Sequence, residues 1–184
     1  MPGYRRRDVH PTRRGLLDGA ARAFAEHGLR RSTMQSIAAA AGVAKATLYN
    51  HFRTKDEVAR ELLARELDRL EELVTALPVA DGLALLADEL GAHPVLRRLA
   101  ESEPDVLTAM LAVPDPEWEQ LTGRLAAALG LDDDGGDLAG RWLAGVVLHP
   151  GRSSARHRQA ARLAVALTAP GQPAGSDRVS TIRS

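Results

Sequence analysis

Residues 37–52 read IAAAAGVAKATLYNHF, and this stretch decides the fold of the N-terminal third of the chain. Apolar residues at three- and four-residue spacing around its first half predict a helix over 33–41. Gly42 then breaks the pattern, and a second short helix is expected over 44–52. Two short helices joined by a glycine-centred turn predict a helix-turn-helix, whose second helix lies in the major groove of DNA.

The second of these helices has distinct inner and outer faces. At about 100° per residue, three apolar residues fall on one side and are expected to face the core: Ala44, Leu48 and Phe52. The outward side carries small, polar and aromatic residues, namely Ala46, Thr47, Tyr49 and Asn50. Such a surface suits base edges and phosphates, because it offers hydroxyl and amide groups without bulk. The same pattern also occurs on ordinary solvated helices, so both interpretations stay open at this point.

Charge is distributed unevenly along a chain whose net charge is zero. Residues 1–60 hold twelve Lys or Arg against five Asp or Glu, residues 61–137 hold five against eighteen, and residues 138–184 hold seven against one. The basic N-terminal block indicates contact with a polyanion; a basic tail beside an acidic surface is the alternative. Exposed N–H groups at the starts of the helices near Thr33 and Lys55 could each hold a phosphate.

The rest of the chain reads as a succession of helices. The first helix is expected over 12–27, with Gly28 as a left-handed C-terminal cap. A long helix over 54–77, ended by Pro78, would measure about 35 Å. Capping boxes are predicted at both Ser32/Gln35 and Thr54/Glu57. Weaker signals predict further helices near 82–91, 94–101, 104–112, 116–129, 137–149 and 153–168. Residues 131–137 are expected to form a loop.

Several function classes lack support in the sequence. The 184 residues are 45% hydrophobic and 26% charged, a soluble globular balance, and no uncharged apolar stretch approaches the roughly 18 residues needed to cross a bilayer. The N-terminus has no signal-peptide core, so a cytoplasmic location is expected. There is no cysteine, no zinc spacing among the six histidines, and Asp132-Asp133-Asp134 lacks the Glu of a calcium loop. With no catalytic constellation or phosphate loop either, neither an enzyme nor a metal or cofactor is predicted.

Residues 37–52, followed by Lys55-Asp56-Glu57, resemble the DNA-binding domain of TetR-family transcriptional regulators. The resemblance covers about residues 12–60 and includes the Gly-Val turn, the Thr-Leu-Tyr triplet and the His-Phe pair. It implies DNA contacts, mostly to phosphates, from Thr33, Lys45, Thr47, Tyr49, His51 and Lys55. Ala46 and Asn50 would then lie nearest the bases. Two departures are Leu29, where the family usually has an aromatic residue, and Ala44, where it often has a capping Ser.

Residues 61–184 show no motif of their own. The resemblance implies an all-helical ligand-binding domain there, whose last two helices form a dimer interface as a four-helix bundle. Apolar residues expected in that interface are Leu143, Val146, Val147, Leu163 and Leu167, with Arg156, Arg158 and Arg162 near its edge. The two tryptophans, Trp118 and Trp142, would either pack in the core or line an apolar effector pocket together with Met110.

The sequence therefore predicts an all-α protein with three parts. These are a helix-turn-helix DNA-binding domain with its N-terminal arm (1–53), a helical effector-binding and dimerisation domain (54–169) and a disordered tail (170–184). The predicted function is a homodimeric repressor that binds a palindromic double-stranded DNA operator and is released by an unidentified small molecule. Two alternatives stay open: a DNA-binding regulator without a small-molecule effector, and a helical interaction module that has lost DNA binding.

Overall fold

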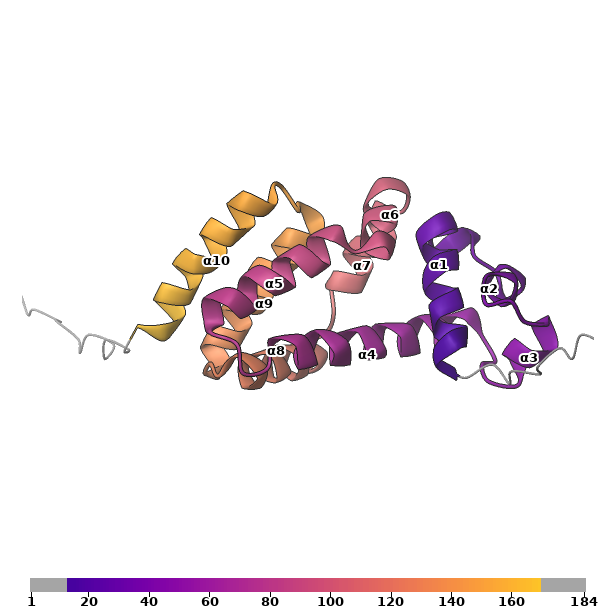
Figure 1. The fold of residues 1–184 in the computed structure, drawn as a ribbon, viewed down its shortest axis with the longest axis horizontal. Coiled ribbons are helices and arrows are strands. Elements are labelled where there is room, and N and C mark those ends of the chain that lie inside the picture. The colour runs from indigo at the N-terminus through magenta and orange to yellow at the C-terminus, as the bar shows by residue number, and fades with distance from the viewer. Residues whose placement is uncertain (1–12, 170–184) are drawn as a thin grey trace, which may run out of the picture.

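The computed structural model describes residues 13–169, and these form ten α-helices and no strand (Figure 1). The helices are α1 (Arg13–Arg31), α2 (Met34–Ala40), α3 (Lys45–Tyr49), α4 (Lys55–Val74), α5 (Val79–Ala92), α6 (Pro94–Ser102), α7 (Pro104–Leu111), α8 (Asp115–Leu129), α9 (Asp133–Leu148) and α10 (Ser153–Thr168). The predicted all-α fold class is confirmed. The predicted N-terminal arm and disordered tail lie outside the described residues.

The helices form an elongated molecule with a small head at one end (Figure 1). Helices α1, α2 and α3 make up this head, and α4 leads from it along one side of the molecule. The remaining helices, α5 to α10, form the body. The twenty residues of α4 span about 30 Å, enough to connect the head with the body.

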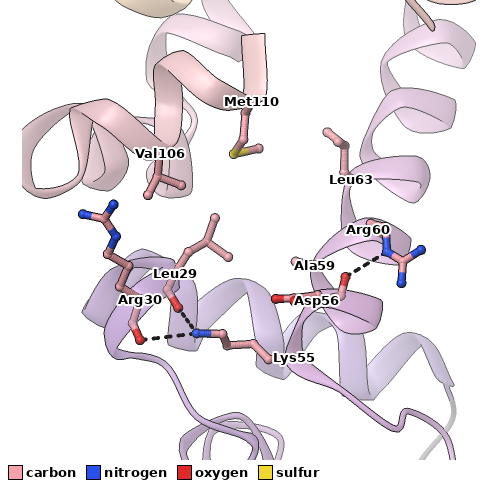
Figure 2. A pocket seen from close by; sticks show the side chains of 9 residues that line it. All are labelled: Leu29, Arg30, Lys55, Asp56, Ala59, Arg60, Leu63, Val106 and Met110. Atoms are coloured by element: carbon pink, nitrogen blue, oxygen red, sulfur yellow. Dashed lines mark hydrogen bonds between the residues drawn. The ribbon is translucent and has the colours of Figure 1, made fainter. Parts of the chain in front are cut away.

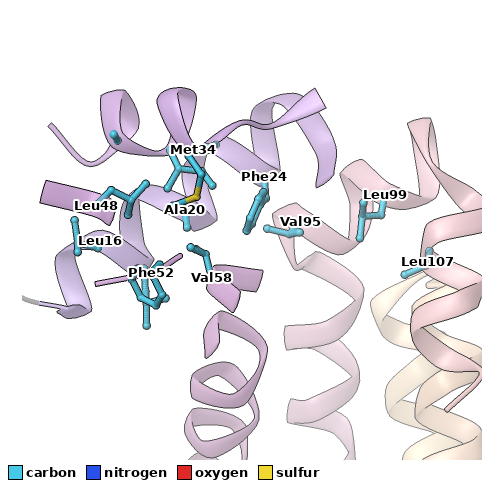
Figure 3. Close-up of a cluster of buried hydrophobic side chains, with 14 of the residues drawn as sticks. Leu16, Ala20, Phe24, Met34, Leu48, Phe52, Val58, Val95, Leu99 and Leu107 are labelled. Atoms are coloured by element: carbon cyan, nitrogen blue, oxygen red, sulfur yellow. The ribbon is translucent and has the colours of Figure 1, made fainter. Parts of the chain in front are cut away.

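The core of the head continues into the body. Phe24, Leu48 and Phe52 are almost completely buried in the head, and Val95 of α6 and Leu107 of α7 belong to the same apolar cluster (Figure 3). A second cluster joins α4, α5, α8, α9 and α10 at the far end of the body. Since buried apolar surface resists separation, the head is a packed part of the molecule and not a tethered module.

Gly28 breaks α1 close to the predicted position. Its backbone has φ 79° and ψ 174°, a conformation open essentially to glycine alone, and the helix then resumes for its last turn to Arg31. The left-handed cap predicts the positive φ of Gly28, but its ψ is far from the value of a left-handed helical residue. The chain therefore bends at Gly28, and the helix continues beyond the bend.

The capping box predicted at Ser32 and Gln35 is wrong by one residue. Thr33 is the N-cap of α2: its hydroxyl accepts the N–H of Ser36 at 3.1 Å, while Ser36 Oγ accepts the N–H of Thr33 at 2.9 Å. Ser32 is instead buried, and its hydroxyl donates to the carbonyl of Gly28 at 2.6 Å. Because the Ser32 hydroxyl bonds to the Gly28 carbonyl at the bend in α1, it does not cap α2, and the next residue, Thr33, is the N-cap.

The start of α4 follows its prediction only in part. Thr54 accepts the N–H of Glu57 at 3.1 Å, but the Glu57 carboxylate accepts the N–H of Arg53 at 2.7 Å and not that of the capping residue. The apolar stripe predicted along this helix is also only partly buried. Its exposed members are Leu63 and Leu73, together with Leu77 just beyond the helix. At these positions the stripe remains accessible to solvent.

The starts of α3 and α9 differ from the prediction for local reasons. Ala44 was expected to face the core, but α3 begins at Lys45 and Ala44 is an exposed, extended N-cap. A residue outside the helix does not follow the helical wheel. The loop predicted over 131–137 is mostly helical, because Asp132 accepts the N–H of Gly135 at 2.8 Å and starts α9.

The apolar strip predicted for a dimer interface is largely used within the protomer. Leu143, Val146 and Val147 on α9 are buried in the chain's own clusters. Arg156 is also buried, at 8% exposure, and its guanidinium donates to Asp88 of α5 at 2.6 Å instead of lying at an interface edge. Burial raises the pKa of Asp88, but hydrogen bonds from His157, Arg156 and Ser153 outweigh it and hold that pKa below its ordinary value.

Within residues 13–169, no helix is both long and apolar enough to span a membrane. The same residues contain no group of three His, Asp or Glu side chains placed to hold a metal ion.

Candidate nucleic-acid interface

A short turn fixes α2 against α3. Gly42 has φ 70°, and the N–H of Val43 reaches back to the carbonyl of Ala38 at 3.0 Å. A side chain at Gly42 would meet open space, so the glycine is needed for its backbone conformation alone. Leu48, 0% exposed, then anchors α3 to the head core. This combination turns one face of α3 inward and presents the other to solvent.

Helix α1 packs closely against the end of α2 and so helps to hold the helix-turn-helix in place. A Cβ atom built on Gly19 would lie 2.4 Å from the Cβ of Ala41, so α1 and α2 touch almost backbone to backbone. The sequence pattern did not single out Gly19. Glycine inside a helix costs about 1 kcal/mol relative to alanine, and its presence in the middle of a helix is the signal that could have identified this contact.

The outward face of α3 carries the residues predicted for DNA. Lys45, Ala46, Tyr49 and Asn50 are exposed, and the Lys45 ammonium lies 5.6 Å from the centroid of the Tyr49 ring. Thr47 is half-buried beside them. A cation, a phenol and an amide thus share one surface of a helix that presents no bulky apolar group apart from the Tyr49 ring.

The flanks of this surface are held by residues that sequence reasoning missed. The Arg13 guanidinium lies 4.5 Å above the Phe52 ring, pairs with Glu61 and donates to the carbonyl of half-buried His51 at 3.3 Å. Hydrogen bonding from Arg13 lowers the pKa of the Glu61 carboxyl below its ordinary value. The pair fastens the first turn of α1 to the end of α3 and to α4. Thr33, at the start of α2, is exposed.

Lys55 differs from the other predicted DNA contacts. Its ammonium donates to the carbonyls of Leu29 at 2.5 Å and Arg30 at 3.3 Å, and the side chain is half-buried. These carbonyls stand at the end of α1, where unpaired carbonyl groups attract a cation. In this structure Lys55 therefore belongs to the junction between head and body.

A buried carboxylate ties the body to that junction. Glu103, between α6 and α7, is 5% exposed and accepts the N–H groups of Leu29 and Arg30, both at 3.1 Å. A Cβ on Gly28 would lie 2.2 Å from Glu103 Oε1, so glycine is also needed to admit the carboxylate. Beside it, the Arg30 guanidinium pairs with Asp105 at 3.1 Å and lowers the pKa of that carboxyl. We call this group of contacts, centred on Glu103, the latch.

The three residues predicted for an effector pocket lie in three different places. Met110 lines a cavity of about 360 Å³ at the junction of head and body. Trp118 on α8 donates its indole N–H to Asp137 at 2.6 Å, with Arg141 over its ring at 5.6 Å. Trp142 lines a groove of about 580 Å³ between α9 and α10. The structure does not bring them together into one pocket.

The geometry of the head is that of a helix-turn-helix DNA-binding domain. Residues 16–62 match the family described as bacterial regulatory proteins, tetR family. The HTH-type transcriptional repressor KstR2 of Mycobacterium tuberculosis is 50% identical over 60 residues, which are 32% of this chain and 30% of KstR2. The match thus spans under a third of that relative. The HTH-type transcriptional repressor Rv1474c of the same species is 29% identical over 131 residues, covering 70% of this chain and 67% of the relative.

Solved structures extend the likeness to the whole fold. The TetR family repressor AlkX from Dietzia has a TM-score of 0.59 at 18% identity, covering 83% of this chain and 93% of AlkX. The fatty acid degradation regulator FadR from Bacillus halodurans has a TM-score of 0.56 at 20% identity, with coverage of 83% and 93%. Residues 16–62 therefore resemble the N-terminal helix-turn-helix domain of the TetR family, and the solved structures show that the likeness of fold extends to the helical body.

Proposed function

We propose that this protein is a DNA-binding transcriptional repressor whose α3 enters the major groove. The observation that carries the proposal is the exposed face of α3, where Lys45, Tyr49 and Asn50 stand together on a helix anchored by Leu48. The names of KstR2 and Rv1474c as repressors support the direction of regulation.

The residues of this face divide by chemistry into base and phosphate contacts. Asn50 offers an amide that can bond two edge groups of adenine, and Ala46 allows close approach of the helix. Lys45 supplies charge to the phosphates, with hydroxyl or ring donors from Thr33, Thr47, Tyr49 and His51. Lys55 is set apart from this group, because its ammonium is engaged at the end of α1.

We further propose that two copies bind a palindromic operator through α9 and α10. The groove between these helices is lined by Trp142, Leu163 and His149 among others, and Val165 of α10 is 71% exposed. Exposed apolar side chains on adjacent helices are suited to a self-complementary interface. A dimer with two-fold symmetry would present two α3 helices to half-sites one DNA turn, about 34 Å, apart.

Release by a small molecule is the regulatory part of the proposal. Helix α4 links head and body, and the latch joins them a second time at Glu103. Together, α4 and the latch set the position of the head on the body. A ligand that binds one such position better than another would shift the protein toward it and change the spacing of the two α3 helices in the dimer. The cytoplasm is the compartment in which such a repressor would act.

Paired substitutions on α3 test the proposal. Lys45→Ala should weaken binding to all DNA sequences and reduce the dependence of log affinity on log salt by about one unit per protomer, hence by about two units for the proposed dimer. Asn50→Ala should alter sequence preference more than total affinity. Arg97→Ala on α6 and Gln120→Ala on α8 are exposed matched controls that should change neither quantity. Unchanged salt dependence in Lys45→Ala, with unchanged preference in Asn50→Ala, would contradict the assignment of α3 to DNA.

A further inference from the structure

The junction of head and body holds a cavity that is open to solvent and is lined by no residue of α3. Its volume is about 360 Å³, within the range of about 300–1,000 Å³ typical of small-molecule sites. The walls come from the end of α1, the first turns of α4 and the side of α7 (Figure 2). The lining residues are Leu29, Arg30, Lys55, Asp56, Ala59, Arg60, Leu63, Val106 and Met110.

The walls of this cavity are mostly apolar and face one another. Met110 of α7 lies across the cavity from Leu63 on α4, and Val106 of α7 points toward Leu29 on the α1 side (Figure 2). Leu63 is 46% exposed, although it lies between two packed parts of the molecule. An apolar group inserted here would remove several side chains from water at once, and this favours an apolar moiety as part of any occupant.

The polar lining favours an anion for the other part of the occupant. Lys55 has three ammonium donors, and the carbonyls of Leu29 and Arg30 use two of them. Arg60 donates to the carbonyl of Asp56 at 3.4 Å and forms no ion pair with a carboxylate among the described residues. Three cationic side chains line the cavity against one carboxylate, that of Asp56. The guanidinium of one of them, Arg30, is paired with Asp105, so Lys55 and Arg60 supply the positive charge that an anion would meet.

We propose that this cavity binds a small amphipathic anion, a monocarboxylate carrying an apolar chain. The carboxylate takes the third donor of Lys55, and the chain lies between Leu63 and Met110. Glu103 stands immediately beside this site, because Leu29 and Arg30 donate their N–H groups to it and their carbonyls accept from Lys55. An occupant therefore acts on the contacts that hold the head to the body.

This consequence rests on the proposed function and supplies its effector site. A carboxylate bound to the third donor shares the Lys55 ammonium with the carbonyls of Leu29 and Arg30, so it weakens the attraction of the cation for the end of α1. The apolar chain of the ligand, inserted between α4 and α7, moves α7 relative to α4. The first residue of α7 follows Glu103 directly, so this movement also displaces Glu103. Both changes weaken the latch, so the occupied protein holds its head less firmly and binds its operator less tightly.

Binding is measured on the free protein with octanoate as the probe. The chain has three methionines, and Met34 lies in the head core while Met110 lines the cavity, so ¹³C-methyl-methionine NMR reports on both regions. Octanoate, kept well below its micelle concentration, should shift the Met110 signal saturably and leave that of Met34 unmoved. Met110→Leu assigns the signal. Octylammonium, with the same chain and the opposite charge, should bind at least about tenfold more weakly.

Two variants and a control test the geometry of the site. Lys55→Gln should weaken octanoate about tenfold but leave octanol binding unchanged, since only the anion uses the ammonium. Ala59→Leu should abolish the Met110 shift by filling the cavity, with the Met34 signal confirming that the head is folded. Arg97→Gln removes an exposed cation elsewhere and should bind octanoate normally. Equal binding of octanoate and octylammonium, or shifts at Met34 as well as Met110, would overturn the proposal.

A separate arm measures DNA, so that the two proposals fail independently. A DNA site selected by the protein should be released by octanoate in the original chain and not in Ala59→Leu. Sequence-specific DNA binding without any Met110 shift overturns the cavity site and leaves the repressor standing. A saturable Met110 shift in a protein that binds no DNA overturns the repressor and leaves the cavity site standing.

Discussion

Removing the Glu103 carboxylate should loosen the head from the body at a predictable cost. The carboxylate is 5% exposed and accepts two backbone N–H groups, those of Leu29 and Arg30. In Glu103→Ala both groups lose a charged acceptor, and each buried loss costs about 1–3 kcal/mol. Water reaches exposed Arg30 more easily than half-buried Leu29, so the expected total is about 2–4 kcal/mol in the free energy of unfolding. For a chain of this size that lowers the melting temperature by about 5–12 °C.

Differential scanning calorimetry with matched variants measures this cost. Glu101→Ala removes the same residue type from an exposed position two residues earlier, and a surface pair of this kind contributes about 0–1 kcal/mol. Gly28→Ala should also be destabilising, because its Cβ meets Glu103 and its φ is 79°. In the double variant Gly28→Ala/Glu103→Ala, the new Cβ no longer meets the Glu103 carboxylate. The double variant should therefore lose less stability than the sum of the losses in the two single variants. Equal melting temperatures for Glu103→Ala and Glu101→Ala would refute the latch.

Three further substitutions test other parts of the structure. Burial lowers the pKa of His93 in the folded protein below its ordinary value of 6.5. The unfolded chain therefore binds the proton more tightly, and the free energy of unfolding should decline as the pH falls from 6.5 through the pKa of the folded state. His93→Asn keeps an acceptor for the N–H of Leu96 and should flatten that decline in urea midpoints between pH 7.5 and 5. Gly19→Ala should destabilise the head by about 1–3 kcal/mol in the same assay, because its Cβ overlaps Ala41. Leu163→Asp should make the proposed dimer monomeric in light scattering or unfold the chain, and a well-folded, intact dimer would place the interface elsewhere.

The elements that depend on local pattern were predictable from the sequence. Gly42 and the apolar spacing around it define the helix-turn-helix, and Leu48 and Phe52 are buried as the helical wheel predicts. The long α4 also follows from its apolar stripe, but it ends at Val74 and not at the predicted boundary before Pro78, which instead caps the start of α5. In each case the signal lies within a few residues, where helix geometry alone relates sequence to structure.

Features that depend on distant partners were not predictable in the same way. Glu103 meets Leu29 across more than seventy positions, and Lys55 turns to the end of α1 because of carbonyls that only the fold brings near. The spacing on α9 predicts an apolar face for a dimer partner, whereas Val146 is buried by other helices of the same protomer. Periodicity shows that a face is apolar, but it does not show which neighbour covers it.

Selection of binding sites from random double-stranded DNA tests the central claim most directly. The account predicts an enriched palindromic motif with two half-sites whose centres lie one helical turn, about 10 base pairs, or a multiple of it apart. Binding to that motif should weaken steeply with rising salt. Failure to enrich any motif, together with salt-insensitive binding to random DNA, would contradict the assignment of α3 as a DNA-reading helix.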